Sequence, residues 1–196
     1  LSQDAVFVCA HGAGGHMADG GMTRAAQTLA GAGFNVVRFN FPYREKGSGR
    51  PDPMPVLKAA VAEAALRTRR ELAPRKLIIG GRSMGGRAAS MLAADGFDCD
   101  GLLLLAYPLH PAGQPEKLRA AHLPQIKLPV LCFNGTRDAL CDRKLMDPIV
   151  AGLDRWQMHW LDGADHSFHV LKSSGRTDDQ VMQEVGATAQ RWLAGR

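Results

Sequence analysis

Short apolar segments alternate with helical patterns along most of this chain, and that alternation constrains the fold more than any other feature. The apolar segments predict strands at Ala5–Ala10, Phe34–Asn40, Lys76–Gly81, Gly101–Tyr107, Pro129–Asn134 and Trp156–Leu161. Such nearly continuous apolar runs are typical of strands that are buried on both faces. The pattern therefore predicts an α/β fold, with a mostly parallel sheet of about six strands and helices on both of its faces.

Helical patterns fill most of the intervals between these segments. We expect helices at Thr23–Ala32, Val56–Leu72, Met84–Ala94 and Lys144–Leu153, and a last one that opens on the capping box of Thr177 and Gln180 and runs to about Trp192. The segments Phe41–Pro55 and Pro108–Leu128 are predicted to be irregular. Parallel sheets bind ligands at the carboxyl ends of their strands, so the functional residues are expected at that edge.

The length and composition fit one soluble globular domain that spans residues 1–196. Hydrophobic residues make up 45% of the chain and charged residues 22%, which excludes a disordered or collagen-like protein. The longest apolar run, Gly101–Tyr107, is far shorter than the ~20 residues of a membrane-spanning helix, so no membrane span is expected. Little chain is left for a second domain or a large lid.

The net charge is modest and does not predict a nucleic-acid partner. Lys and Arg number 24 against 19 Asp and Glu, which gives a formal charge of +5. The densest basic cluster, Arg67–Lys76, has no interleaved aromatic residues. We interpret it as a solvated helix end, and a nucleic-acid groove is the weaker alternative.

The four cysteines indicate a reducing compartment. None of them forms a C-x-x-C pair, and Cys9 and Cys132 lie inside predicted strands, so we expect free buried thiols. No signal peptide is visible, and together these features predict a cytoplasmic protein. The given sequence begins at Leu1 rather than Met, which leaves room for a leader or a first strand ahead of it.

The motif Gly81-Arg82-Ser83-Met84-Gly85 joins a predicted strand directly to a predicted helix. A sharp turn at such a junction strains its middle residue and brings other chain close to the residues two before and two after it. Gly81 and Gly85 have no side chain there, so the turn would project the Ser83 hydroxyl at the amino end of the helix. Ser83 is therefore the candidate nucleophile. The alternative is a glycine-rich turn with an incidental serine.

A serine nucleophile needs a general base, and His166 is the candidate because it follows the last predicted strand. It lies in Asp162-Gly-Ala-Asp-His166-Ser-Phe, where it should reach the carboxyl edge of the sheet. His169 is the nearest rival and lies farther from the strand end. The alternative interpretation of His166 is a solvated loop residue.

The orienting acid should follow the penultimate strand, and Asp138 does so in Asn134-Gly-Thr-Arg-Asp138. A carboxylate there would hold the imidazole in the correct tautomer and stabilise the imidazolium ion. The rivals are Asp142, Asp162 and Asp165. Asp165 ranks low because adjacent side chains diverge, and Asp142 is expected at a helix start. Alternatively, Asp138 only forms a turn.

Two backbone N–H groups are candidates for an oxyanion hole. One belongs to Met84, which follows the nucleophile. The other should come from the loop His11-Gly12-Ala13-Gly14-Gly15, where we expect the N–H of Ala13, with Gly14 next and His11 as a brace. A dinucleotide-binding loop is excluded because Met17 replaces the third glycine of G-x-G-x-x-G, and the lysine of a P-loop is missing.

The segments HGAGG, GGRSMGGR, NGTRD and DGADHSF together resemble the α/β-hydrolase superfamily. Within it the chain is most similar to small lidless serine hydrolases of the testis-expressed protein 30-like and dienelactone-hydrolase-like group, which residues 39–53 and 105–123 also support. The resemblance implies a three-layer α/β-hydrolase fold without a lid domain, with Ser83 as nucleophile, Asp138 as acid and His166 as base. Their order along the chain is that of α/β-hydrolases and not of chymotrypsin or subtilisin.

The chain departs from the family pattern in two ways. The usual fold begins with two more strands, so this sequence starts at the third. Dienelactone hydrolases generally use a cysteine where this chain has Ser83. Some relatives also serve in eukaryotic chromatin complexes, where catalysis is not the evident role. The resemblance therefore carries an alternative, a non-catalytic α/β-hydrolase-like interaction module.

The sequence as a whole predicts a serine hydrolase that cleaves a small ester through an acyl-enzyme, with no metal ion or organic cofactor. Hydrolysis of a thioester or a carbon–carbon bond by the same residues is the alternative. A metal site at Asp165, His166 and His169 ranks lower because its remaining ligand is not placed. The segments Phe41–Pro55 and Pro108–Leu128 should rim a shallow, open pocket for short-acyl esters.

Several cations near these segments have two interpretations. Arg44, Lys46 and Arg50, with Arg82 beside the nucleophile, would favour an anionic substrate. Alternatively they are surface charges and braces for the loop, which is the interpretation we prefer. Arg87, one turn into the helix after the nucleophile, is expected to pair with a neighbouring carboxylate.

Overall fold

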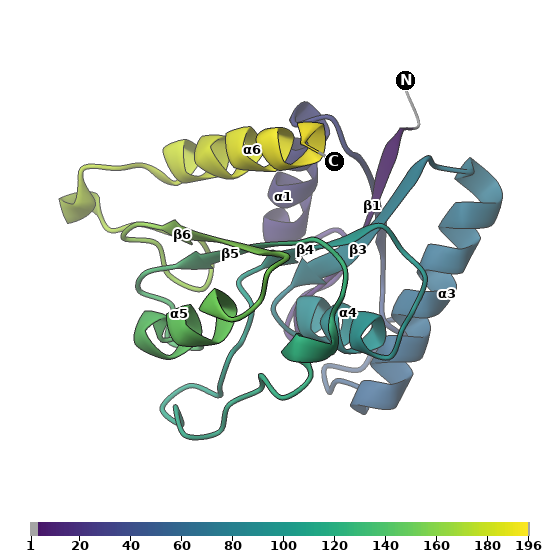
Figure 1. The fold of residues 1–196 in the computed structure, drawn as a ribbon, viewed down its shortest axis with the longest axis horizontal. Helices are drawn as coiled ribbons and strands as arrows, with labels where there is room; N and C mark the ends of the chain where they lie inside the picture. Colours follow the sequence, from purple (N-terminus) through teal and green to yellow (C-terminus); the bar gives the residue numbers. More distant parts are fainter. Residues whose placement is uncertain (1–3, 196) are drawn as a thin grey trace.

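The computed structural model describes residues 4–195, and in this part of the chain the six predicted strands form one sheet in which all neighbours run parallel (Figure 1). The strands are β1 (Ala5–Ala10), β2 (Asn35–Phe39), β3 (Lys76–Arg82), β4 (Gly101–Leu105), β5 (Val130–Gly135) and β6 (Trp156–Leu161). Their order across the sheet is β2-β1-β3-β4-β5-β6. From β1 the chain first adds β2 on one side and then returns to add β3 and the later strands on the other side. Parallel sheets bind ligands at the point where the strand order reverses in this way, here between β1 and β3.

Helices cover both faces of the sheet. They are α1 (Gly20–Gly31), α2 (Pro42–Glu45), α3 (Met54–Leu72), α4 (Met84–Ala94), α5 (Arg143–Ala151) and α6 (Asp178–Ala194). In Figure 1, α1 and α6 lie on one side of the strands and α3, α4 and α5 on the other. The buried apolar residues form two clusters, one between the sheet and α1 and α6, and the other between the sheet and α3, α4 and α5. The three layers predicted from the sequence are therefore confirmed.

Each central strand sends its side chains alternately into the two clusters. On β1, Phe7 and Cys9 pack with α1 and α6, whereas Val8 and Ala10 pack with α3 and α4. Burying one large apolar side chain contributes about 1.5–3 kcal/mol, while an unpaired polar group in the same place is costly. This two-sided burial explains why the strand segments of the sequence are apolar almost without interruption.

The ends of some elements differ from the prediction for local reasons. Helix α1 begins before the expected Thr23 because Asp19 caps it, accepting the N–H of Met22 at 2.8 Å. The segment predicted to be irregular after β2 contains α2, which begins at Pro42, whose fixed φ suits the first position of a helix. The capping box of Thr177 at the start of α6 is confirmed.

The connections that follow the strands gather at the carboxyl edge of the sheet. In the connection after β4, residues 106–122 contain no helix, and a short 3₁₀ turn at Leu123–Gln125 ends it. Across residues 4–195, no helix is both long and apolar enough to cross a membrane.

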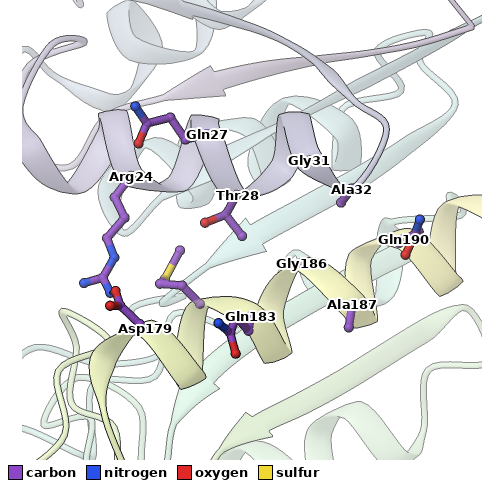
Figure 2. A pocket seen from close by; sticks show the side chains of 11 residues that line it. Arg24, Gln27, Thr28, Gly31, Ala32, Asp179, Gln183, Gly186, Ala187 and Gln190 are labelled. Atoms are coloured by element: carbon purple, nitrogen blue, oxygen red, sulfur yellow. The ribbon is translucent and has the colours of Figure 1, made fainter.

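Helices α1 and α6 approach each other closely and leave a surface groove beside their contact (Figure 2). Gly186 of α6 permits the approach, since a Cβ atom on it would lie 3.3 Å from Cγ2 of Thr28 on α1. An ion pair between Arg24 and Asp179 joins the same two helices (Figure 2). The packing of this layer therefore depends on a position without a side chain.

Replacement of Gly186 by valine should lower the free energy of unfolding by about 1–3 kcal/mol, because the added methyl groups overlap Thr28 and force the helices apart. Gly31→Ala is the matched control, since a Cβ atom there meets nothing within 4 Å and alanine is the better helix former. Urea denaturation followed by circular dichroism compares the two variants. Equal loss of stability in both would contradict this account of the packing.

Candidate active site

The turn between β3 and α4 is shaped by backbone that lies against two glycines. A Cβ atom on Gly81 would lie 2.6 Å from the N atom of Ala10, and one on Gly85 would lie 2.6 Å from the carbonyl oxygens of Ala10 and His11. Neither position has room for a side chain. Ser83, between them, has φ 49° and ψ −118°, a conformation that costs a residue with a side chain about 1–3 kcal/mol.

The Ser83 side chain lies next to His166, and His166 lies next to Asp138. Ser83 Oγ is 2.9 Å from Nε2 of His166. The other ring nitrogen, Nδ1, is 2.9 Å from Oδ1 and 2.8 Å from Oδ2 of Asp138. The structure thus brings together three side chains that follow three different strands, β3, β5 and β6.

Asp138 is buried, and its carboxylate accepts two further hydrogen bonds. Its side chain is 0% exposed, against 25% for that of His166. The N–H of Leu140 donates to Oδ1 at 2.8 Å, and Nδ2 of Asn134 donates to Oδ2 at 3.1 Å. An ionised carboxylate can only accept, so it keeps the imidazole proton on Nδ1. The lone pair of Nε2 is then directed at Ser83.

Asn134 is a buried polar residue of the site that sequence reasoning did not single out. Its Nδ2 also donates to the carbonyl oxygen of Tyr107 at 3.0 Å, and its Oδ1 accepts the N–H of Tyr107 at 3.2 Å. The amide thereby joins the end of β4 to the carboxylate of Asp138. The available signal was its position, a polar amide at the end of an apolar segment and just before a glycine.

A second close backbone contact brings the loops of Asp138 and His166 together. A Cβ atom on Gly135 would lie 2.5 Å from the carbonyl carbon of Ala164 and 2.8 Å from the carbonyl oxygen of Asp165. Across the same contact, the N–H of Arg137 donates to the carbonyl oxygen of Ala164 at 2.9 Å. The loop after β6 therefore reaches Asp138 only because position 135 has no side chain.

The rival residues have other contacts. Asp142 caps α5, and Asp165 accepts backbone N–H groups of its own loop. The carboxylate of Asp162 accepts a long hydrogen bond, at 3.4 Å, from the side chain of Thr136. The ring of His169 lies 3.0 Å from the carboxylate of Asp178 at the start of α6. None of these contacts involves Ser83 or His166.

The loop after β1 borders one cavity with Ser83 and His166. The cavity has a volume of about 560 Å³ and is lined by Gly12, Ala13, Gly14, Gly15, Asp19, Gly21, Arg82, Ser83, His166 and Ser167. Within residues 4–195 the N–H of Ala13 has no hydrogen-bond acceptor. Met84 is the first residue of α4, so the helix does not use its N–H either. Both predicted donors are available to a bound atom.

A second serine–histidine pair lies farther along α4. Ser90 Oγ is 2.8 Å from Nε2 of His122, and the same hydroxyl donates to the carbonyl oxygen of Arg87 at 2.8 Å. Ser90 is fully buried, so a substrate has no access to it. Burial, with a smaller contribution from the charge of Arg87, lowers the pKa of His122 to about 4. This pair, with a buried serine and a half-buried neutral histidine, is a packing contact between α4 and the connection after β4.

The cations near Ser83 mostly hold backbone. Nη2 of Arg82 donates to the carbonyl oxygen of His166 at 3.2 Å, and Arg44 donates to carbonyl oxygens of the loop after β1. These contacts favour the interpretation as braces. The expected pairing of Arg87 is wrong: it forms no ion pair with the carboxylates of residues 4–195, and its buried Nε has no hydrogen-bond partner.

The cysteines do not compete with Ser83 for the role of nucleophile. All four are free and buried, and burial raises the pKa of the thiols of Cys9 and Cys99 to about 12. Thiols in such surroundings stay protonated and are unreactive. In the described part of the chain, no three His, Cys, Asp and Glu side chains are grouped so that they could hold a metal ion.

The sequence matches a known family over almost its whole length. Residues 3–194 match the family described as an alpha/beta hydrolase domain. The chain belongs to this family. The six-stranded parallel sheet with helices on both faces is thereby that of an α/β-hydrolase, and the fold predicted from the sequence is confirmed.

Several solved structures share this fold. A putative α/β-hydrolase of Agrobacterium tumefaciens is 21% identical with a TM-score of 0.78, over 100% of this chain and 88% of that one. A serine hydrolase without a lid from Xanthomonas campestris is 22% identical with a TM-score of 0.74, over 99% and 82%. A dienelactone hydrolase of Anabaena variabilis is 18% identical with a TM-score of 0.72, over 98% and 86%. These similarities show the fold, which is lidless like that of the Xanthomonas protein.

Replacement of Asn134 by alanine should destabilise the protein by about 1–3 kcal/mol, because it leaves the buried N–H of Tyr107 without its acceptor. The carbonyl oxygen of Tyr107 loses one hydrogen bond and keeps that from the N–H of Leu109 at 3.1 Å. Asn40→Ala is the matched control, since Asn40 accepts one exposed hydrogen bond from the N–H of Met17 and its loss should cost less. Chemical denaturation at neutral pH measures both. The same small loss in the two variants would contradict a structural role for the buried amide.

Proposed function

We propose that this protein is a serine hydrolase that cleaves a small ester through an acyl-enzyme intermediate. The observation that carries the proposal is the series of short contacts from Ser83 Oγ through the ring of His166 to the buried carboxylate of Asp138. Membership of the α/β-hydrolase family supports hydrolysis as the class of reaction.

In the first half of the proposed reaction, Ser83 Oγ attacks the carbonyl carbon of the ester and Nε2 of His166 takes the hydroxyl proton. The imidazolium ion so formed is stabilised by the Asp138 carboxylate, which acts strongly because it is shielded from water. The carbonyl oxygen becomes an oxyanion and accepts the N–H groups of Met84 and Ala13. When the tetrahedral intermediate collapses, His166 gives the proton to the leaving alcohol.

In the second half, water replaces the alcohol. His166 takes a proton from the water as its oxygen attacks the acyl carbon, and the same two N–H groups hold the second oxyanion. Collapse of this intermediate returns the proton to Ser83 and releases the carboxylic acid. The cycle therefore balances with water as its second reactant.

The cavity favours a small acyl group. The residues that border it are glycines, one alanine and polar or charged side chains. A long acyl chain gains binding free energy by burying apolar surface, at about 25 cal/mol per Å², and it would find little such surface here. We therefore assign the site to short-acyl esters.

Two other functions use the same fold. The proposed machinery would also cleave a thioester or a carbon–carbon bond, and the chemistry of the substrate distinguishes these. A non-catalytic interaction module is disfavoured by the backbone of Ser83, because strain of this kind persists where function requires it.

Labelling with a fluorophosphonate probe tests the nucleophile. We expect the wild type to be labelled and Ser83→Ala to lose the label, because the probe reacts with an activated hydroxyl. Ser90→Ala, on the same helix, is the matched control and should be labelled like the wild type. Circular dichroism checks that each variant folds. Folded wild type without Ser83-dependent labelling would overturn the hydrolase proposal and favour the interaction module.

Asp138→Asn should lower kcat for a p-nitrophenyl acetate substrate by about 10³- to 10⁴-fold, since an amide at this position favours the wrong tautomer of His166. Asp162→Asn is the control and should leave kcat near the wild-type value, because Asp162 does not contact His166. Initial rates with the ester and with a matched acetyl thioester would also separate the two substrate classes. Loss of turnover in Asp162→Asn alone would show that the acid is wrongly assigned.

A further inference from the structure

The segment after β2 that contains α2, residues 41–52, is hydrogen-bonded to the loop after β1, residues 12–15. We infer that this segment, the clamp, fixes the direction of the N–H groups in that loop, the oxyanion loop, with Tyr43 and Arg44 as positioning residues. The inference rests on the proposed function, because the loop binds an oxyanion only if Ser83 forms a tetrahedral intermediate. It gives a role to residues 41–52, part of the segment Phe41–Pro55 that was expected to rim the pocket, and it specifies what Arg44 holds as a brace.

The first half of the oxyanion loop is held by two buried rings. Nδ1 of His11 donates to the carbonyl oxygen of Gly12 at 2.8 Å. The hydroxyl of Tyr43 donates to the carbonyl oxygen of Ala13 at 2.8 Å. Tyr43 is only 2% exposed, so this hydroxyl comes from inside the protein. Both carbonyl groups are thereby drawn toward the core.

The second half of the oxyanion loop is held by Arg44. Its Nη2 donates to the carbonyl oxygen of Gly14 at 3.2 Å, and its Nε donates to that of Gly15 at 2.7 Å. Its Nη1 donates to the carbonyl oxygen of Ser48 within the clamp, at 3.3 Å. All three nitrogens of the guanidinium are thus bound to backbone, which leaves Arg44 poorly placed to bind an anionic substrate.

The carbonyl groups that accept these hydrogen bonds determine where the N–H groups of the oxyanion loop point. In a trans peptide the carbonyl of one residue and the N–H of the next point in opposite directions, and no cis peptide occurs in residues 4–195. His11 holds the carbonyl of Gly12 and Tyr43 holds that of Ala13, both toward the core. The N–H groups of Ala13 and Gly14 therefore point away from the core. Neither has an acceptor in the described part of the chain, and both residues border the cavity that contains Ser83.

The clamp is itself fixed at both ends. At its start, the N–H of Phe41 donates to Nε2 of His11 at 3.1 Å, which requires a neutral ring because Nδ1 already donates. Burial lowers the pKa of His11 and so favours that neutral form. At its end, the carboxylate of Asp52 accepts the N–H of Tyr43 at 2.9 Å. The tyrosine therefore cannot move away from the oxyanion loop without breaking a second contact.

Tyr43→Phe tests the clamp by removing one hydroxyl. We expect kcat for a short-acyl ester to fall about tenfold or more with KM little changed, because an oxyanion donor acts only in the transition state. The affinity for a trifluoromethyl ketone, which forms an oxyanion on Ser83, should fall by a similar factor. Tyr107→Phe is the matched control, since its buried hydroxyl donates at 2.7 Å to the carbonyl oxygen of Arg119, away from the oxyanion loop.

Arg44→Gln is the second variant, in case Tyr43→Phe does not fold, with Lys46→Gln as its control. Arg44 holds the carbonyl groups of Gly14 and Gly15, which follow the two free N–H groups, so its loss should loosen the end of the oxyanion loop. We therefore expect kcat and ketone affinity to fall in Arg44→Gln as well, by less than in Tyr43→Phe. If the folded variants keep both quantities at the level of their controls, the clamp is overturned while the hydrolase proposal stands. A wild type that is not labelled at Ser83 overturns the hydrolase proposal, and the clamp with it.

Discussion

The site depends on one close contact between main chains, that of β1 with the turn after β3. In the parallel pairing of these strands, Ala10 lies opposite Gly81, and Gly85 packs against the same carbonyl group. The last residue of β1 therefore lies directly beneath the turn that carries Ser83. Because the oxyanion loop begins two residues later, at Gly12, one contact places both the hydroxyl and the facing N–H groups. A methyl group at either glycine would separate the two.

The proposed acid and base are brought together in the same physical way, by close main-chain packing, at strands β5 and β6. Gly135 lets the loop after β6 pass directly over the end of β5. Because β5 and β6 pair in parallel, the loops with Asp138 and His166 leave the sheet at the same edge. Asp138 is then enclosed by backbone and by the amide of Asn134, whereas His166 keeps part of its ring exposed. In the resulting arrangement the carboxylate of Asp138 is held firmly and shielded from water, whereas the imidazole of His166 remains partly accessible to water.

Local patterns predicted much of this molecule, because a strand buried on both faces and a strand-to-helix turn each leave a signature in neighbouring residues. The six strands lie where their apolar segments indicated, and the side chains expected to meet at the carboxyl edge lie within hydrogen-bonding distance. Contacts between distant segments were harder to predict. Three examples are the pairing of Asn134 with Tyr107, the contacts of Arg44, and the lack of an ion pair at Arg87 within residues 4–195. They depend on side-chain directions that sequence spacing does not encode.

The two segments that were expected to rim the pocket contribute no lining residue to the cavity at Ser83, and they differ in how freely each can change. The clamp is bonded to the oxyanion loop, so an insertion there would disturb groups next to the reacting atoms. The tip of the connection after β4, residues 111–118, is mostly exposed and has no such bonds to the oxyanion loop among the described residues. New binding surface can therefore be added on that side without altering the machinery. In a protein of this architecture, substrate range can diversify after β4 while the region after β2 stays under constraint.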